Sequence, residues 1–256
     1  MKLIDSHIHF DQYDLSMRET ILRDMERYHI EALISVSKDI RSAEQNLQLH
    51  KFDPRIKVAV GYHPEQSLPT NEELEKLYTI IRKNKETIVG IGEVGLPYYL
   101  RRKNPKLDLA PYLEILESFI HIAKELDQPI ILHAIYEDAY PVVTLLKKYQ
   151  VDRAHFHWFK GDSFTLQTIL KEGYYVSVTP DVLYEKEIEA IVSQTPLEQL
   201  FVETDGPWPF KGPFTGEVTH PKMMHETVRK ISQIKALSLE QTYRQIYYNT
   251  KQFYRL

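Results

Sequence analysis

The chain has 256 residues, of which 43% are hydrophobic and 27% charged, which is enough apolar material for the core of one large globular domain. Its 36 acidic and 32 basic residues give a formal charge of −4, which excludes a protein held on nucleic acid or membrane by overall positive charge. It has no cysteine, so disulfides and thiolate metal sites are excluded, and histidine, aspartate and glutamate remain as metal ligands.

Short apolar segments rich in β-branched residues alternate along the chain with longer amphipathic segments. The expected strands are, in chain order, Leu3–His9, Ala32–Val36, Val58–Gly61, Ile88–Glu93, Ile130–His133, Ala154–His157, Tyr174–Val178 and Leu200–Glu203. The expected helices are Met17–Tyr28, Ser42–Leu49, Asn71–Lys83, Leu107–Leu126, Tyr140–Tyr149, Ser163–Lys171, Glu185–Val192, Met223–Lys235 and Leu239–Phe253. About eight strand–helix units in about 250 residues is the pattern of a (β/α)8 TIM barrel, an α/β fold, and we predict a single domain over residues 1–256. An open doubly wound sheet is the alternative, which the count of eight disfavours.

The N-terminal residues lack the charged stretch and apolar core of a signal peptide, and no apolar run reaches the roughly 18 residues of a membrane helix. We therefore expect a cytoplasmic protein that does not associate with membranes. Nothing in the sequence indicates an obligate protein partner.

Two histidines, His7 and His9, lie one residue apart at the end of the first expected strand, in LIDSHIHFD. Alternate residues of a strand point to the same face, so both imidazoles would project to one side. Two neutral imidazoles side by side make good metal ligands. Taken alone, the pair is equally compatible with two polar residues that share no function. Asp5 and Asp11 flank the pair and are candidates to support it by hydrogen bonds, and for Asp11 a loop carboxylate without this role is an equal alternative.

More potential ligands follow the ends of later strands. They are His63 after the third strand, Glu93 ending the fourth, His133 ending the fifth, His157 after the sixth and Asp205 after the eighth. The carboxyl ends of all strands in a barrel meet at one rim, where barrel enzymes have their active sites. A single histidine at a strand end is commonly a capping or packing residue, but a carboxylate in the apolar GIGEVG segment needs a cation or a hydrogen-bond partner. With His7 and His9 included, all these side chains except His63 could hold two divalent ions.

Six motifs in this order, IDSHIHFD, GYHPE, IGEVGL, PIILHA, HWFKG and VETDGP, resemble those of the TatD family of metal-dependent hydrolases, within the amidohydrolase-like barrels. The resemblance extends over essentially the whole chain. It implies a first metal ion held by His7, His9 and Asp205 and a second held by His133 and His157, with Glu93 bridging the two.

The activity that the resemblance implies is metal-dependent hydrolysis of phosphodiesters, as a deoxyribonuclease, with DNA ends as one expected form of the substrate. Two divalent ions, Zn²⁺, Mg²⁺ or Mn²⁺, would lower the pKa of a shared water and neutralise charge on the phosphoryl oxygens. The expected catalytic residues are Asp205, which takes the proton from this water, and Glu93, which tunes the metal pair. His63 is expected to contact the substrate phosphate or the leaving oxygen, and a loop histidine without a function is the alternative.

Two positions depart from the family pattern. Family members commonly carry an acid where this chain has Pro97 and an arginine where it has Ile135. Arginine is a natural bidentate partner for phosphate, so the second change removes an expected substrate contact and leaves the metal ligands intact. Arg101 and Arg102, in the basic and aromatic stretch YYLRRKNPK, are candidate substrate-binding residues, and a solvated loop is the alternative.

Four residues after the sixth and eighth strands have the same ambiguity. Lys160 and Lys211 are further cations expected at the rim. Trp208 and Phe210, in GPWPF, either form an apolar wall of the substrate site or anchor the loop that carries them.

Two other functions remain open on the sequence. Amidohydrolase-like barrels also hydrolyse amides and lactones, and Pro97 and Ile135 favour this alternative weakly. A barrel that holds metal and binds a partner without turnover is the other alternative, and retention of all six ligand residues argues against it.

Overall fold

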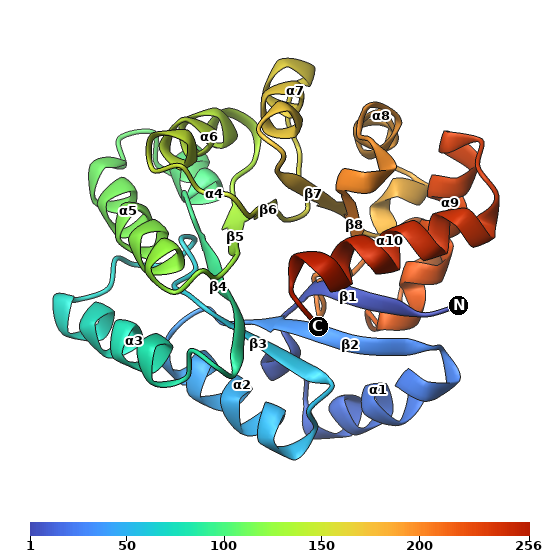
Figure 1. The fold of residues 1–256 in the computed structure, drawn as a ribbon, viewed down its shortest axis with the longest axis horizontal. Helices are drawn as coiled ribbons and strands as arrows, with labels where there is room; N and C mark the ends of the chain where they lie inside the picture. Colours follow the sequence, from blue (N-terminus) through green and yellow to red (C-terminus); the bar gives the residue numbers. More distant parts are fainter.

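The structure, a computed structural model that describes all 256 residues, confirms the TIM barrel: eight parallel strands form one sheet in chain order, with helices around it (Figure 1). The strands are β1 Leu3–Ile8, β2 Ile30–Val36, β3 Ile56–Val60, β4 Ile88–Gly95, β5 Ile130–His133, β6 Ala154–Phe156, β7 Tyr175–Val178 and β8 Leu200–Val202. The helices are α1 Leu15–Arg27, α2 Ile40–Phe52, α3 Asn71–Lys83, α4 Tyr98–Lys103, α5 Ala110–Glu125, α6 Ala139–Lys148, α7 Ser163–Lys171, α8 Lys186–Gln194, α9 Met224–Lys235 and α10 Leu239–Phe253. None of these helices combines the length and the apolar character that crossing a membrane requires.

The barrel closes between its last and first strands through backbone hydrogen bonds just beyond the strand ends. The Asp205 N–H donates to the His7 carbonyl at 2.9 Å, and the His9 N–H donates to the Gly206 carbonyl at 2.8 Å. These two bonds join the segment after β8 to the end of β1. Three of the expected metal ligands are therefore brought together by the same contacts that close the barrel.

Two apolar layers hold the barrel together. The outer layer packs the strands against the surrounding helices, as expected for strands whose outward side chains are covered by helices. The inner layer comprises Ile4, Ala32, Ile34, Val36, Ala59, Ile131, Phe201, Phe253 and Tyr254. In β5 the two layers alternate, because Ile131 belongs to the inner one and its neighbours Ile130 and Leu132 to the outer one.

The carboxyl end of α10 covers the amino-terminal end of the barrel. The Arg153 guanidinium, just before β6, donates to the Phe253 carbonyl at 3.0 Å, and Arg255 pairs with Asp127, just before β5, at 2.6 Å. Phe253 and Tyr254 thereby fill the interior from below. The opposite end of the barrel, at the carboxyl ends of the strands, is left for the pocket described below.

The first helices begin earlier than predicted, because aspartate caps precede their apolar pattern. Asp14 accepts a hydrogen bond from the Met17 N–H at 2.8 Å, and Asp39 accepts one from the Ser42 N–H at 2.8 Å. The sequence pattern predicts that the two helices start at Met17 and Ser42. In the structure each starts two residues earlier, directly after its cap, α1 at Leu15 and α2 at Ile40.

A short helix, α4, lies in the YYLRRKNPK stretch, where the sequence predicts no helix. The Glu65 carboxylate accepts hydrogen bonds from the N–H groups of Tyr99 at 2.6 Å and Leu100 at 2.8 Å. These donors at a helix start have no partner within the helix. Because the cap comes from the loop after β3, the local sequence of α4 does not contain the signal that forms it.

Asn46, buried on α2, fixes this helix to the end of β2, and its removal should destabilise the fold. Its amide donates to the Val36 carbonyl (3.2 Å) and the Ser37 hydroxyl (3.1 Å) and accepts from the Ser35 hydroxyl (2.7 Å). Asn46→Ala leaves these buried groups unpaired, so we expect the free energy of unfolding in urea to fall by about 2 to 4 kcal/mol. The control is Gln48→Ala on the exposed face of α2, expected to change it by less than about 0.5 kcal/mol. Equal losses in the two variants would contradict this role.

Candidate metal centre

His7 and His9 both reach the site, although β1 ends at Ile8 and His9 lies in the turn that follows. Their ring centres are 5.3 Å apart, and the ring of His7 stacks on that of His157 at 3.8 Å. Both histidines are buried. The geometry therefore brings together the two rings that the sequence pattern predicts on one side.

Glu93 is positioned by an irregularity in β4. The pairing of β4 with β5 shifts register between Ile91 and Val94, and such a bulge re-aims the side chain that it contains. Just beyond it, a Cβ added to Gly95 would lie 2.0 Å from the His133 carbonyl oxygen, so only glycine allows this approach of the two strands. Gly95, two residues after Glu93, thus allows β4 to lie close to His133.

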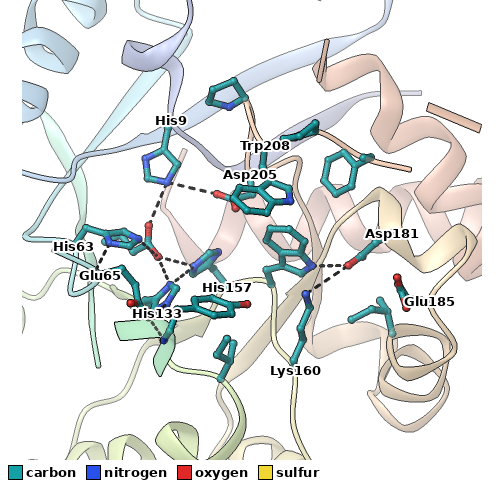
Figure 2. Close-up of a pocket in the computed structure, with 18 of the residues that line it drawn as sticks. His9, His63, Glu65, His133, His157, Lys160, Asp181, Glu185, Asp205 and Trp208 are labelled. Atoms are coloured by element: carbon teal, nitrogen blue, oxygen red, sulfur yellow. Dashed lines mark hydrogen bonds and ion pairs between the residues drawn. The ribbon is translucent and has the colours of Figure 1, made fainter. Parts of the chain in front are cut away.

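The two oxygens of the Glu93 carboxylate face two different groups of histidines. Oε2 lies 3.3 Å from Nε2 of His7 and 3.3 Å from Nε2 of His9. Oε1 lies 2.9 Å from Nδ1 of His133 and 2.6 Å from Nε2 of His157. Figure 2 shows His9, His63, His133 and His157 gathered in the pocket with Asp205 beside them. One carboxylate thus lies between two clusters of nitrogen donors.

Asp205 joins the cluster of His7 and His9. Its Oδ1 atom lies 3.3 Å from Nε2 of His7 and 3.5 Å from Nε2 of His9. Its backbone has φ 48°, a left-handed conformation that is uncommon outside glycine and is tolerated best by asparagine and aspartate. The preceding Thr204 is held by the buried Asp5, which accepts from its hydroxyl at 2.5 Å and from its N–H at 3.0 Å. Asp5 therefore supports the segment that presents Asp205.

The residues present fit a divalent cation. Nε2 of His7, Oε2 of Glu93 and Oδ1 of Asp205 are buried and have no hydrogen-bond partner in the protein. Buried polar atoms are almost always paired, so three unpaired ones that face one another indicate a missing positive partner. The candidate ligand atoms of His7, His9 and Glu93 all lie within 4.8 Å of one another, and nitrogen with carboxylate oxygen is a donor set that Zn²⁺ and related ions accept.

The Glu93 carboxylate is ionised in this environment. Burial acts to raise the pKa of its carboxyl group, but His157, His63 and His7 outweigh burial and hold the pKa well below its ordinary value. No arginine or lysine contacts this carboxylate. Its charge is therefore balanced by imidazoles and by any cation bound between them.

Glu203 also belongs to the candidate site, and the sequence pattern did not predict this, although the residue lies in the VETDGP motif. It is buried, and its carboxylate accepts from the Trp158 N–H at 2.7 Å and the Ser177 hydroxyl at 2.6 Å. Its Oε1 lies 3.4 Å from Nδ1 of His157. A carboxylate near one ring nitrogen orients the ring, here with Nε2 towards Glu93, as it would have to be to hold an ion. The signal in the sequence was a second acid at an apolar strand end.

His63 reaches the centre but presents a different face from the other histidines. Its Nε2 lies 3.5 Å from Glu93 Oε1, while its Nδ1 accepts a hydrogen bond from the Glu65 N–H at 3.1 Å. Burial lowers the pKa of His63 well below its ordinary value, so the ring is neutral. With Nδ1 as an acceptor, the proton of the neutral ring lies on Nε2. His63 therefore offers a hydrogen-bond donor to the pocket, which distinguishes it from a ligand.

A pocket of about 970 Å³ lies over the centre and is lined by His9, His63, Glu93, His133, His157 and Asp205 among others. Ile135 also lines it, as do four lysines, Lys38, Lys103, Lys160 and Lys211. Arg101 and Arg102 do not line it. Arg101 pairs instead with the buried Asp138 and lies 3.5 Å from Glu137, and Arg102 is exposed on α4. The positive charge at the mouth of the pocket comes from lysines.

Comparison with known proteins agrees with the fold and identifies the family. A family model described as "TatD related DNase" matches residues 4–255. An uncharacterized metal-dependent hydrolase of Haemophilus influenzae is 39% identical over 255 residues, which cover 99% of this chain and 100% of that protein. Human "Deoxyribonuclease TATDN3" is 25% identical over 248 residues, 93% of this chain and 89% of the relative. The crystal structure of YJJV, a TatD homologue from Escherichia coli, has the same fold, with a TM-score of 0.87, 21% identity, and coverage of 99% of this chain and 98% of that one. The chain belongs to the family of TatD related DNases and is a metal-dependent hydrolase with a TIM-barrel fold.

Proposed function

We propose that this protein is a dinuclear metal-dependent phosphodiesterase that acts on DNA. The observation that carries the proposal is the position of Glu93, whose two carboxylate oxygens face separate histidine clusters at 2.6 to 3.3 Å. Such a carboxylate would bridge two ions, one held with His7, His9 and Asp205 and the other with His133 and His157. Two bound Zn²⁺, Mg²⁺ or Mn²⁺ ions would supply an activated water and neutralise charge on the phosphoryl oxygens.

The residues of the chain would then divide the remaining work. The ring of His7 stacks on that of His157 at 3.8 Å, and Glu203 lies behind His157. This contact would keep the two groups of histidines at a fixed separation. The pKa of Asp205 stays below its ordinary value, because the neighbouring imidazoles of His7, His9 and His157 together outweigh the effect of burial, so this carboxylate is ionised and can accept a proton from the attacking water. His63 Nε2–H would donate to a substrate oxygen.

The human relative is named a deoxyribonuclease, which supports DNA as the substrate. In this chain Ile135 lines the pocket where family members commonly carry arginine, so the pocket lysines would take over contacts to phosphate. Arg101 and Arg102 lie outside the pocket and would contact only a longer strand that extends past its rim. We place their proposed role there.

An amidohydrolase acting on an amide or lactone is the second candidate, favoured by the apolar Ile135 in the pocket wall. A panel of single-stranded DNA, simple phosphodiesters, amides and lactones, assayed with each of the three metals, decides between them. Cleavage of phosphodiesters supports the proposal. Cleavage of amides or lactones alone would replace it with the second candidate. If no compound in the panel is cleaved, the result favours a barrel that holds metal and binds a partner without turnover.

Asp205→Asn should remove most of the activity. The amide keeps the size of the side chain but cannot take a proton from water, so we expect kcat on single-stranded DNA to fall by at least about 100-fold. The thermal unfolding temperature should stay close to that of the wild type. The control is Asp152→Asn, the same change at an exposed position just before β6, at the opposite end of the barrel. A kcat within threefold of the wild-type value for Asp205→Asn would contradict the assigned role.

Metal content should rise with pH. Burial and His157 act to lower the pKa of His7, but Glu93 and Asp205 outweigh them and raise it to about 9 in the metal-free site. A proton on His7 competes with the ion, and fewer rings are protonated as pH rises. We therefore expect metal content, measured by elemental analysis at limiting metal, to increase from about pH 5 to about pH 8.

Two variants test whether the bound metal depends on the proposed ligands. His133→Ala should lower metal content at every pH, whereas His121→Ala, on the exposed face of α5, should leave it unchanged. A metal content that is flat across this pH range, or equal in the two variants, would contradict the proposed ligand set.

A further inference from the structure

The chain has two tryptophans, and both line the pocket over the metal centre. Trp158 follows β6 and is fixed by its indole N–H, which donates to the Asp181 carboxylate at 2.7 Å. Trp208 follows β8, and its ring meets that of Trp158 edge to face with centres 6.0 Å apart. Trp208 is 59% exposed, although solvent exposure of so large an apolar ring is unfavourable. Figure 2 shows Trp208 beside Asp205, within the pocket.

The exposed ring of Trp208 is not needed to anchor its loop. That role belongs to Phe210, which is 4% exposed and packs with Phe214 and Met223 in a small apolar cluster. The backbone of Trp208 is also held on both sides, because its N–H donates to the Asp205 carbonyl at 3.1 Å and its carbonyl accepts from the Thr219 hydroxyl. The loop is therefore fixed without the indole, which is left facing the pocket.

A cation lies on the same side of the pocket. The Lys160 ammonium is 4.2 Å from the centre of the Trp158 ring and 4.0 Å from the Asp181 carboxylate, farther than a hydrogen bond. Asp181 accepts hydrogen bonds from Trp158 and, at 2.6 Å, from the Thr179 hydroxyl. Lys160 thus retains its N–H donors for a ligand, and the cation–π contact with Trp158 holds it in place. Figure 2 shows Lys160 beside Asp181.

A second exposed aromatic side chain lies across the barrel. Tyr99, after β4, lines the pocket and is 45% exposed, with its ring 6.2 Å from that of His133. Strands β4 and β8 are four positions apart in a barrel of eight, so Tyr99 and Trp208 lie on opposite walls. The metal centre lies between two flat rings, of which the one on Trp208 has a cation nearby.

We propose that the wall formed by Trp208, Trp158 and Lys160 is a nucleotide subsite, in which Trp208 stacks on a base and Lys160 binds the phosphate next to the one that is cleaved. Base–aromatic stacking tolerates every base, because each has a flat π face, so the subsite recognises a nucleotide without selecting its sequence. The inference rests on the proposed phosphodiesterase function and specifies which part of the substrate is bound beside the reacting bond.

The test measures binding separately from hydrolysis. Deoxyadenosine monophosphate and 2-deoxyribose 5-phosphate carry the same phosphate and differ by the base, and both are titrated into the protein as purified. Binding is followed by calorimetry and by tryptophan fluorescence, which reports on this pocket alone because both tryptophans line it. The variants are Trp208→Ala, Trp208→Phe and Lys160→Met, and the control is Phe52→Ala, a 79% exposed ring at the end of α2.

We expect wild-type protein to bind the nucleotide roughly 5- to 150-fold more tightly than the sugar phosphate, and Trp208→Ala to abolish this difference. Trp208→Phe keeps a stacking ring and should retain most of it, Lys160→Met should weaken both ligands, and Phe52→Ala should change neither. On a thymidine dinucleotide, Trp208→Ala should raise KM and leave kcat within about threefold.

Equal affinity of the wild type for the two ligands, including no binding of either, overturns the subsite, as does a Trp208→Ala variant that keeps the preference. Either result leaves the phosphodiesterase proposal standing if the dinucleotide is cleaved. The opposite result is also distinguishable. If the wild type binds the nucleotide more tightly than the sugar phosphate, and Trp208→Ala removes this difference, but no phosphodiester is cleaved, the proposed function is overturned and the nucleotide subsite stands.

Discussion

The structure depends on one buried negative charge, the carboxylate of Glu93. An ionised carboxylate in the interior of a protein is costly unless it is paired and hydrogen-bonded, and here neither arginine nor lysine supplies the balance. Imidazoles from β1, β5 and the segment after β6 surround it instead. In the metal-free site the raised pKa of His7 keeps a proton on its ring, which balances part of this charge. The rings must be neutral to bind an ion, so bound cations would take over the balance from protons.

Closure of the barrel and assembly of the site are the same event in this fold. The hydrogen bonds between His7 and Asp205 and between His9 and Gly206 complete the ring of strands and also place three ligands. Asp5 and Thr204 reinforce this seam from beneath. An incompletely closed barrel would therefore separate Asp205 from His7 and His9 even if every residue were present, so folding errors at this seam would break up the candidate ligand cluster.

The convergence of the candidate ligands could be predicted from the sequence because its signal is local. Each follows an apolar strand, and parallel strands bring their ends to one rim whatever the detailed packing. Glu65, Glu203 and α4 could not be predicted in this way. Glu65 caps a helix that begins more than thirty residues later, and Glu203 acts through His157, so their roles exist only after distant segments meet. The tautomer of His63 likewise depends on one hydrogen bond, which the Glu65 N–H donates to its Nδ1.

The end of α10 under the barrel determines where a substrate could enter the site and where products could leave it. Phe253 and Tyr254 block the amino-terminal end of the barrel interior, so the pocket above the metal centre is closed at its base. Whatever enters must leave by the entrance through which it came. A polymer could not thread through the barrel, and under the proposed function each product would have to leave before the next substrate reached the metal centre. Exchange at this entrance would then contribute, with the chemistry, to the rate of turnover.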